Sequence, residues 1–247
     1  MRRSPEEKQA ARAAFRALPP ARKLEHIWIY DKWFILLGLA AVIILGSVLY
    51  RTLTRRDRVL SLAVLNTLTG SRLEQTLGPE YLTWAGLDPA KAEVQVLTDL
   101  YLSEDASAMS HEAAYASRIK LLAMIEGKEL DLVLMNREAY DILSNSGYLL
   151  ELDSLAPENP LPAGLAEQLA ENRVIVSDNA IEYRLGEAEE YQVETRPARN
   201  AVPGSALPLL EQAGFDEAVY LGVIANTPRL PACLAYLRYL GDGTKDN

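Results

Sequence analysis

The feature that most constrains this chain is an uncharged stretch, residues 33–50, that reads WFILLGLAAVIILGSVLY. Asp31 and Lys32 precede it and Arg51 follows it. As a helix, these eighteen residues would span roughly 27 Å, close to the thickness of a bilayer's hydrocarbon core. Aromatic side chains lie at both ends of the stretch, as they do at membrane interfaces: Trp28, Tyr30 and Trp33 at one end and Tyr50 at the other. The sequence therefore predicts a single transmembrane helix.

Two other interpretations of this stretch fit the sequence less well. A cleaved signal peptide usually has a short leader, an apolar region of about 7–15 residues and a small-residue cleavage site. Here the leader is 32 residues long, the apolar run is longer, and GSVLY followed by Arg51 offers no such site. A buried core helix is the second alternative, but a run of this length that is apolar all round is rare in a soluble domain. An uncleaved anchor is the expectation.

Charge divides the chain sharply. The overall formal charge is −9, but residues 1–32 carry +4 and residues 51–58 carry +3, which leaves −16 for residues 59–247. A strongly acidic body excludes non-specific nucleic-acid binding, which needs a basic face. Eight Lys and Arg residues lie before the apolar stretch and four follow it closely. This bias predicts a protein of the cell membrane with a cytoplasmic N-terminus and an extracellular body.

The expected organisation has five parts. Residues 1–32 form a cytoplasmic basic head with a short amphipathic helix, and residues 33–50 form the transmembrane helix. Residues 51–58 are a linker, residues 59–241 an extracellular α/β domain, and residues 242–247 a disordered tail. About 190 residues are enough for one domain with a sizeable core.

Within that domain, apolar runs alternate with helical patterns. Strands are predicted over residues 59–65, 93–98, 130–135 and 219–225, and helices over residues 71–84, 111–126, 137–144, 207–213 and 227–241. This alternation predicts a mostly parallel sheet with flanking helices. Three short strand-like runs, at residues 174–177, 181–185 and 191–195, are interpreted as a small meander or hairpin.

The motifs of common enzymes and cofactor sites are missing from the sequence. It has no G-x-G-x-x-G, no Walker A lysine, no H-E-x-x-H and no G-x-S-x-G, and only two histidines. Acidic stretches such as residues 187–190 have the composition of solvated surface. Its one cysteine, Cys233, lies among leucines and is interpreted as a buried apolar side chain. We expect no enzyme activity, no cofactor and no metal.

What remains is a positional signal. In an open parallel sheet, ligands bind beyond the carboxyl ends of the strands. Short polar side chains stand at those points, and they are the candidate ligand-binding residues: Asn66, Thr67, Asp99, Asn136, Arg137 and Asn226. The alternative is that these Asn and Thr side chains only cap the helices that follow.

Four stretches resemble bacterial extracellular solute-binding proteins of the type-2 periplasmic fold. Residues 59–66 resemble that family's opening strand, and Gly127-x-x-x-Asp131 with LVL resembles its helix-Gly-Asp-strand unit. GYLLEL at residues 147–152 is similar to the segment that follows. VYLGVIANTP at residues 219–228, with residues 232–240, resembles the return strand and closing helix.

This resemblance implies one lobe of such a protein plus a rudimentary second lobe, since about 190 residues are too few for two full lobes. It also implies a function. The chain would be a non-catalytic, membrane-tethered solute-binding component that works with a transporter permease and takes a small polar solute or peptide. The alternative is a structural or sensory accessory membrane protein that binds a protein partner and no solute.

Overall fold

The computed structural model describes residues 33, 36–47, 49, 56–67, 70–103, 111–155, 157–213, 215 and 217–242. The chain divides into two compact units, Met1–Arg55 and Arg56–Asn247. Several predictions lie outside the described residues: the amphipathic helix of the head, most of the linker, and the tail beyond residue 242.

The predicted transmembrane helix is contradicted. The described residues 36–47 are helical, and their side chains are exposed. Within the described ranges, no helix is both long enough and apolar enough to cross a bilayer.

The second unit begins with three parallel strands. Strand β1 (Asp57–Leu65) pairs in parallel with β2 (Ala92–Leu100) and with β3 (Leu132–Asn136). Three short helical segments join β1 to β2, and they are α3 (Ser71–Gln75), the π-helix η1 (Thr76–Glu80) and α4 (Tyr81–Trp84). Helix α5 (His111–Glu126) joins β2 to β3. This half follows the predicted alternation of strands and helices.

The other half of the sheet is antiparallel. Helix α6 (Arg137–Asn145) leads through two 3₁₀ turns, η3 (Leu152–Ser154) and η4 (Ala166–Gln168), to β4 (Ala170–Asp178). Helix α7 (Ala180–Leu185) separates β4 from β5 (Val193–Pro203). After η5 (Gly204–Ala206) and α8 (Pro208–Glu211), the chain ends with β6 (Val219–Val223) and α9 (Leu230–Asp242).

The predicted mostly parallel sheet is therefore wrong. The strand order is β2-β1-β3-β6-β5-β4, and the β3–β6, β6–β5 and β5–β4 pairs are all antiparallel. The rudimentary second lobe is wrong as well, because β4 and β5 extend the same sheet. Strands β4 and β5 are consecutive and joined at one end, a connection that makes neighbours antiparallel. Residues 181–185, predicted as a strand, belong to α7, which ends at Gly186 in a left-handed conformation.

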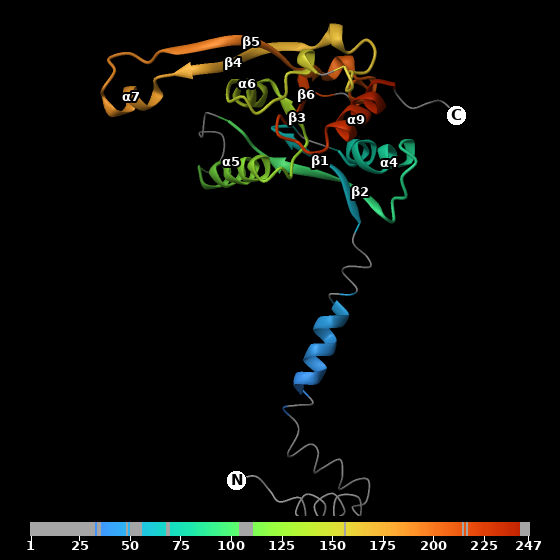
Figure 1. Ribbon diagram of the computed structural model, residues 1–247. Coiled ribbons are helices and arrows are strands. Elements are labelled where there is room, and N and C mark those ends of the chain that lie inside the picture. The colour runs from blue at the N-terminus through green and yellow to red at the C-terminus, as the bar shows by residue number, and fades with distance from the viewer. Residues whose placement is uncertain are drawn as a thin grey trace, which may run out of the picture. The chain divides into compact units, whose positions relative to one another are not determined.

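Helices cover both faces of the sheet (Figure 1). On one face, Leu60, Leu62 and Val64 of β1 pack in a core with the α3–α4 segment and α9. On the other face, Ala63 and Leu65 pack in a second core with α5 and α6. Side chains alternate between the faces of a strand, so one apolar run supplies both cores.

An aromatic cluster ties α9 to the segment before β2. Pro79 lies inside η1 and has no N–H to donate to the helical ladder. The hydroxyl of Tyr236 donates to the carbonyl oxygen of Leu77 at 2.7 Å, and that of Tyr239 donates to Thr76 at 2.9 Å. The two tyrosines thus hydrogen-bond carbonyls in the turn that carries the proline.

Candidate functional site

A polar groove lies between α6 and the β4–β5 hairpin. Its volume is about 760 Å³, within the range of small-molecule sites. Three arginines, two carboxylates, two amides, a hydroxyl and a proline line it: Arg137, Asp141, Asn145, Glu171, Asn172, Arg173, Thr195, Arg196 and Pro197. The chemistry of such a lining suits a small, hydrated, charged solute.

Helix α6 supplies one wall of the groove. Arg137, Asp141 and Asn145 are spaced four residues apart, which places them on one face of the helix. The guanidinium of Arg137 pairs with the carboxylate of Asp141 at 3.0 Å. It also lies 5.7 Å from the ring centroid of Tyr140 and 5.9 Å from that of Tyr220, and these two rings are stacked. The hydrogen bond that Arg137 donates to the carboxylate of Asp141 raises the pKa of Arg137, so the guanidinium stays charged.

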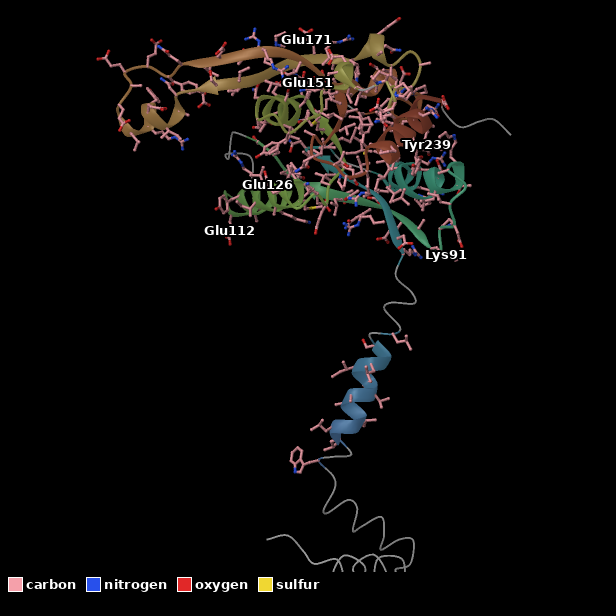
Figure 2. The ribbon with its side chains drawn as sticks, viewed as in Figure 1. Lys91, Glu112, Glu126, Glu151, Glu171 and Tyr239 are labelled. Atoms are coloured by element: carbon pink, nitrogen blue, oxygen red, sulfur yellow. The ribbon has the colours of Figure 1, made fainter. Side chains whose placement is uncertain are left out.

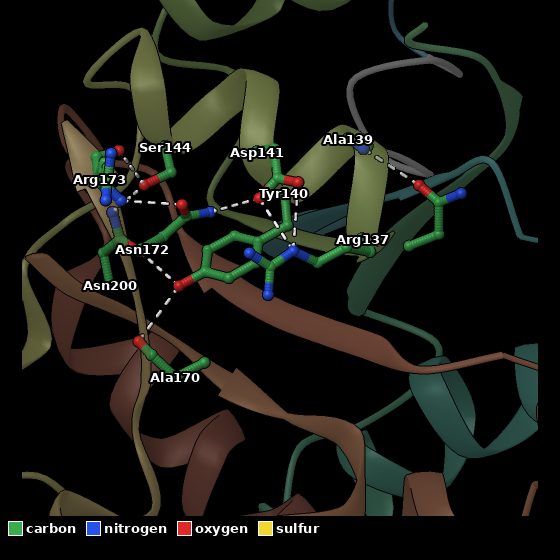
Figure 3. A network of polar contacts seen from close by, with 10 residues as sticks. Arg137, Ala139, Tyr140, Asp141, Ser144, Ala170, Asn172, Arg173 and Asn200 are labelled. Carbon is green, nitrogen blue, oxygen red and sulfur yellow. Dashed lines mark hydrogen bonds and ion pairs between the residues drawn. The ribbon is translucent and has the colours of Figure 1, made fainter. Parts of the chain in front are cut away.

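A buried network fixes α6 to the hairpin (Figure 3). The hydroxyl of Tyr140 lies 2.9 Å from Oδ1 of Asn200 and 3.1 Å from the carbonyl oxygen of Ala170, so its proton has two acceptors. Asn200 donates to the hydroxyl of Ser144, which donates to the carbonyl oxygen of Arg173. Burial raises the pKa of Tyr140 well above its ordinary value, so the donor proton is retained. These hydrogen bonds therefore fix the position of α6 relative to the β4–β5 hairpin.

The outer rim of the groove carries a second ion pair. Arg196 on β5 donates through both terminal nitrogens to the carboxylate of Glu151, in the segment after α6. That hydrogen bonding lowers the pKa of Glu151. Figure 2 labels Glu151 and Glu171 on the part of the body that carries β4 and β5.

Two charged side chains of the groove have no such partner. Within the described part of the chain, neither Glu171 nor Arg173 makes a side-chain hydrogen bond or ion pair, and both are exposed. They are two residues apart on β4, so their Cα atoms are about 7 Å apart. Their side chains leave the same face of the strand, which is the solvent-exposed face opposite to the one from which Asn172 reaches Asp141. The groove thus presents one uncommitted cation and one uncommitted anion.

Two of the sequence-predicted residues meet at the carboxyl ends of β1 and β3. Asn66 donates to Oδ1 of Asn136 at 3.2 Å, and its amide also exchanges hydrogen bonds with the backbone of Leu102. Asn136 caps α6 by accepting from the N–H of Ala139 at 3.1 Å. Thr67 donates to the carbonyl oxygen of Leu65. Asn136 thus caps the helix that follows it, as in the alternative interpretation, whereas Asn66 and Thr67 hydrogen-bond the backbone of other segments and cap no helix.

The remaining predicted residues are dispersed. Asp99 is exposed on β2, and its carboxylate accepts from Thr98. Asn226 follows β6, which runs antiparallel to β3, so it lies at the end of the strands opposite to Asn136. Its amide donates to the carbonyl oxygen of Ile125. Arg137 alone of the six candidates lines the groove.

Sequence reasoning missed most of the groove. The spacing of Arg137 and Asp141 on a helix is a signal that could have found that pair. The groove residues on β4 and β5 begin 26 positions after Asn145, the last groove residue of α6. The sequence predicted their hairpin only approximately. No local pattern connects them to α6.

Asp131, the last residue of the Gly127-x-x-x-Asp131 motif, is the centre of a second, buried cluster of polar contacts. Its Oδ2 accepts from the backbone N–H of Ser61 at 2.7 Å and from Nε of Arg229 at 2.9 Å. Its Oδ1 accepts from the hydroxyl of Thr227. Asp131 is fully buried, and its partners come from β1 and the β6–α9 connection. Its contacts are structural.

Comparison of the chain with protein-family models, with curated proteins and with solved structures finds no match. The resemblance to type-2 solute-binding proteins therefore rests on the quoted motifs and stays a prediction. Among the described residues, no three His, Cys, Asp or Glu side chains are grouped to hold a metal ion.

Proposed function

We propose that this chain is a non-catalytic binding protein that holds a small solute with both a positive and a negative charge in the groove between α6 and the β4–β5 hairpin. The observation that carries the proposal is the uncommitted pair on β4, Glu171 and Arg173. A guanidinium binds a carboxylate through paired hydrogen bonds, and a carboxylate binds an ammonium group. Amino acids and short peptides carry both groups.

The groove walls also favour binding because they are already ordered. The amide of Asn172 donates to the carboxylate of Asp141 at 2.8 Å, and Ser144 donates to the backbone of Arg173. Binding of a solute would therefore cost the protein little conformational entropy, which raises the affinity. The transporter partner and the extracellular position of the body are predictions that accompany this proposal.

The test is a thermal-shift screen of the purified full-length chain against free amino acids, dipeptides and neutral sugars. A ligand at a hundred times its dissociation constant should stabilise the protein by about 2.7 kcal/mol. We expect shifts with amino acids or dipeptides and none with sugars.

The variants Glu171→Gln and Arg173→Gln should each lose the shift, whereas Arg184→Gln, which alters an arginine of α7 outside the groove, should keep it. A screen that shifts with no compound would overturn solute binding. A shift that survives both groove variants would place the site elsewhere.

A further inference from the structure

The β4–β5 hairpin extends beyond the sheet to which it belongs. Strand β5 pairs with β6 only at Ala201, Val202 and Pro203, whereas it pairs with β4 from Val193 to Ala201. Most of both strands therefore have only each other as neighbours. In Figure 1 the two strands run outward past α6, with α7 at their far end.

Large apolar side chains are exposed over the end of this hairpin, residues 176–194, here called the hairpin tip. Six of them are 44–67 % exposed: Val176, Ile181, Tyr183, Leu185, Tyr191 and Val193. Single exposed apolar residues are ordinary, whereas clustered ones are a signal of an interaction site. Within this group the ring centroids of Tyr183 and Tyr191 lie 6.1 Å apart. The groove does not use any of these residues.

The tip is built as an ordered structure. Asn179 accepts from the N–H of Gln192 at 2.7 Å and donates to the carbonyl oxygen of Glu190 at 2.9 Å, so it joins both sides of the loop. Asp178 accepts from the N–H of Ala180 at the start of α7. Such a frame presents the apolar side chains in place, which reduces the entropy lost on binding.

The charge of the tip points to the kind of partner. Residues 176–194 contain six acidic side chains and one basic one, Arg184, for a net charge of −5. Two tips of this charge repel each other, and so do a tip and an anionic membrane. A surface that combines apolar and basic side chains is complementary to the tip in both respects.

We propose that the hairpin tip is a docking site for a protein partner that presents an apolar patch surrounded by Lys and Arg. Apolar burial would supply the affinity, and the acidic side chains would speed encounter and select the partner. This interaction is separate from solute binding in the groove and does not depend on it.

The test uses the full-length chain and two dye-labelled helical peptides. Both have leucines at helical spacing, and one carries lysines and the other glutamates on the opposite face. Fluorescence anisotropy should show binding of the lysine peptide, weakened by added salt, and none of the glutamate peptide. The double variant Ile181→Ser with Leu185→Ser should weaken binding about tenfold or more, as expected for interface anchors.

The matched control is Tyr115→Ser with Ile119→Ser, which removes from α5 two exposed apolar side chains that are also four residues apart. It should leave the affinity unchanged. If circular dichroism shows that the tip variant is unfolded, a variant with Glu187, Glu189 and Glu190 replaced by Gln is tested instead. It should also weaken binding of the lysine peptide.

Three results would overturn the proposal. Equal binding of both peptides would remove the charge argument. Equal loss in the α5 control would remove the assignment to the tip. Sedimentation that shows self-association of the wild-type chain, abolished by the tip variant, would make a second copy the occupant.

Discussion

Asp131 shows how one side chain secures several elements. It lies fully buried at the start of β3, where its carboxylate joins β1 through Ser61 and the β6–α9 connection through Thr227 and Arg229. A buried carboxylate is tolerated only when its lone pairs are satisfied and a countercharge is near. Removing it leaves both the Ser61 N–H and the Arg229 guanidinium without that acceptor.

We expect Asp131→Ala to destabilise the protein by about 3 kcal/mol, at the lower end for a broken buried pair, because Arg229 retains 29 % side-chain exposure. Urea unfolding of the full-length chain measures this. The control is Asp141→Ala, which removes an exposed ion pair with Arg137 and one hydrogen bond from Asn172 and should cost less, about 1 to 2 kcal/mol. Similar losses in the two variants would contradict the structural role.

Cys233 should be unreactive in the folded protein. It is fully buried, and burial, followed by the nearby Asp131, raises the pKa of its thiol to about 12. At pH 8 the thiol is therefore protonated, and the thiolate is the reactive form. A disulfide reagent such as dithiobisnitrobenzoate should label no thiol in native buffer and one per chain in guanidinium. Rapid labelling of the native chain would show that α9 does not pack as described.

At the scale of elements, the hairpin combines two roles that can be separated. Its base is joined to α6 by Tyr140, Ser144 and Asn172, and this part forms the groove. Its tip makes hydrogen bonds within itself and contributes no residue to either core. Stability should therefore depend on the base and not on the tip.

Replacing residues 176–194 by Asn-Gly tests that separation. The dipeptide forms a tight hairpin turn and would join Ile175 to Thr195, which are paired across β4 and β5. We expect the free energy of unfolding to change by less than about 1 kcal/mol, as for surface changes away from packed features. Solute shifts in the groove should persist, while lysine-peptide binding should vanish. Global unfolding of this variant would show that the tip supports the body.

At the scale of the whole molecule, residues 56–247 form a compact unit of their own. Two buried cores lie on opposite faces of its single sheet, and both are complete within these residues. We expect a fragment of residues 56–247 to be soluble and to unfold in one cooperative transition, since a domain of this size buries enough surface. Aggregation of the fragment, or a transition without cooperativity, would contradict this.

The sequence by itself determined the elements of the parallel half. Apolar runs such as residues 59–65 favour strands covered on both faces, and the helix predicted over residues 111–126 has the bounds of α5. These signals are local: they depend on side-chain period and on caps, which lie a few residues apart.

Only the tertiary structure decided the rest. The direction of β6, the continuation of the sheet through β5 and β4, and the meeting of α6 with the hairpin are pairings between distant segments. Strand direction leaves no local mark, because side chains alternate in the same way in parallel and antiparallel strands. For that reason Asn66 and Asn136 meet while Asn226 lies at the opposite end of the strands, and the groove beside Arg137 emerged only from the fold.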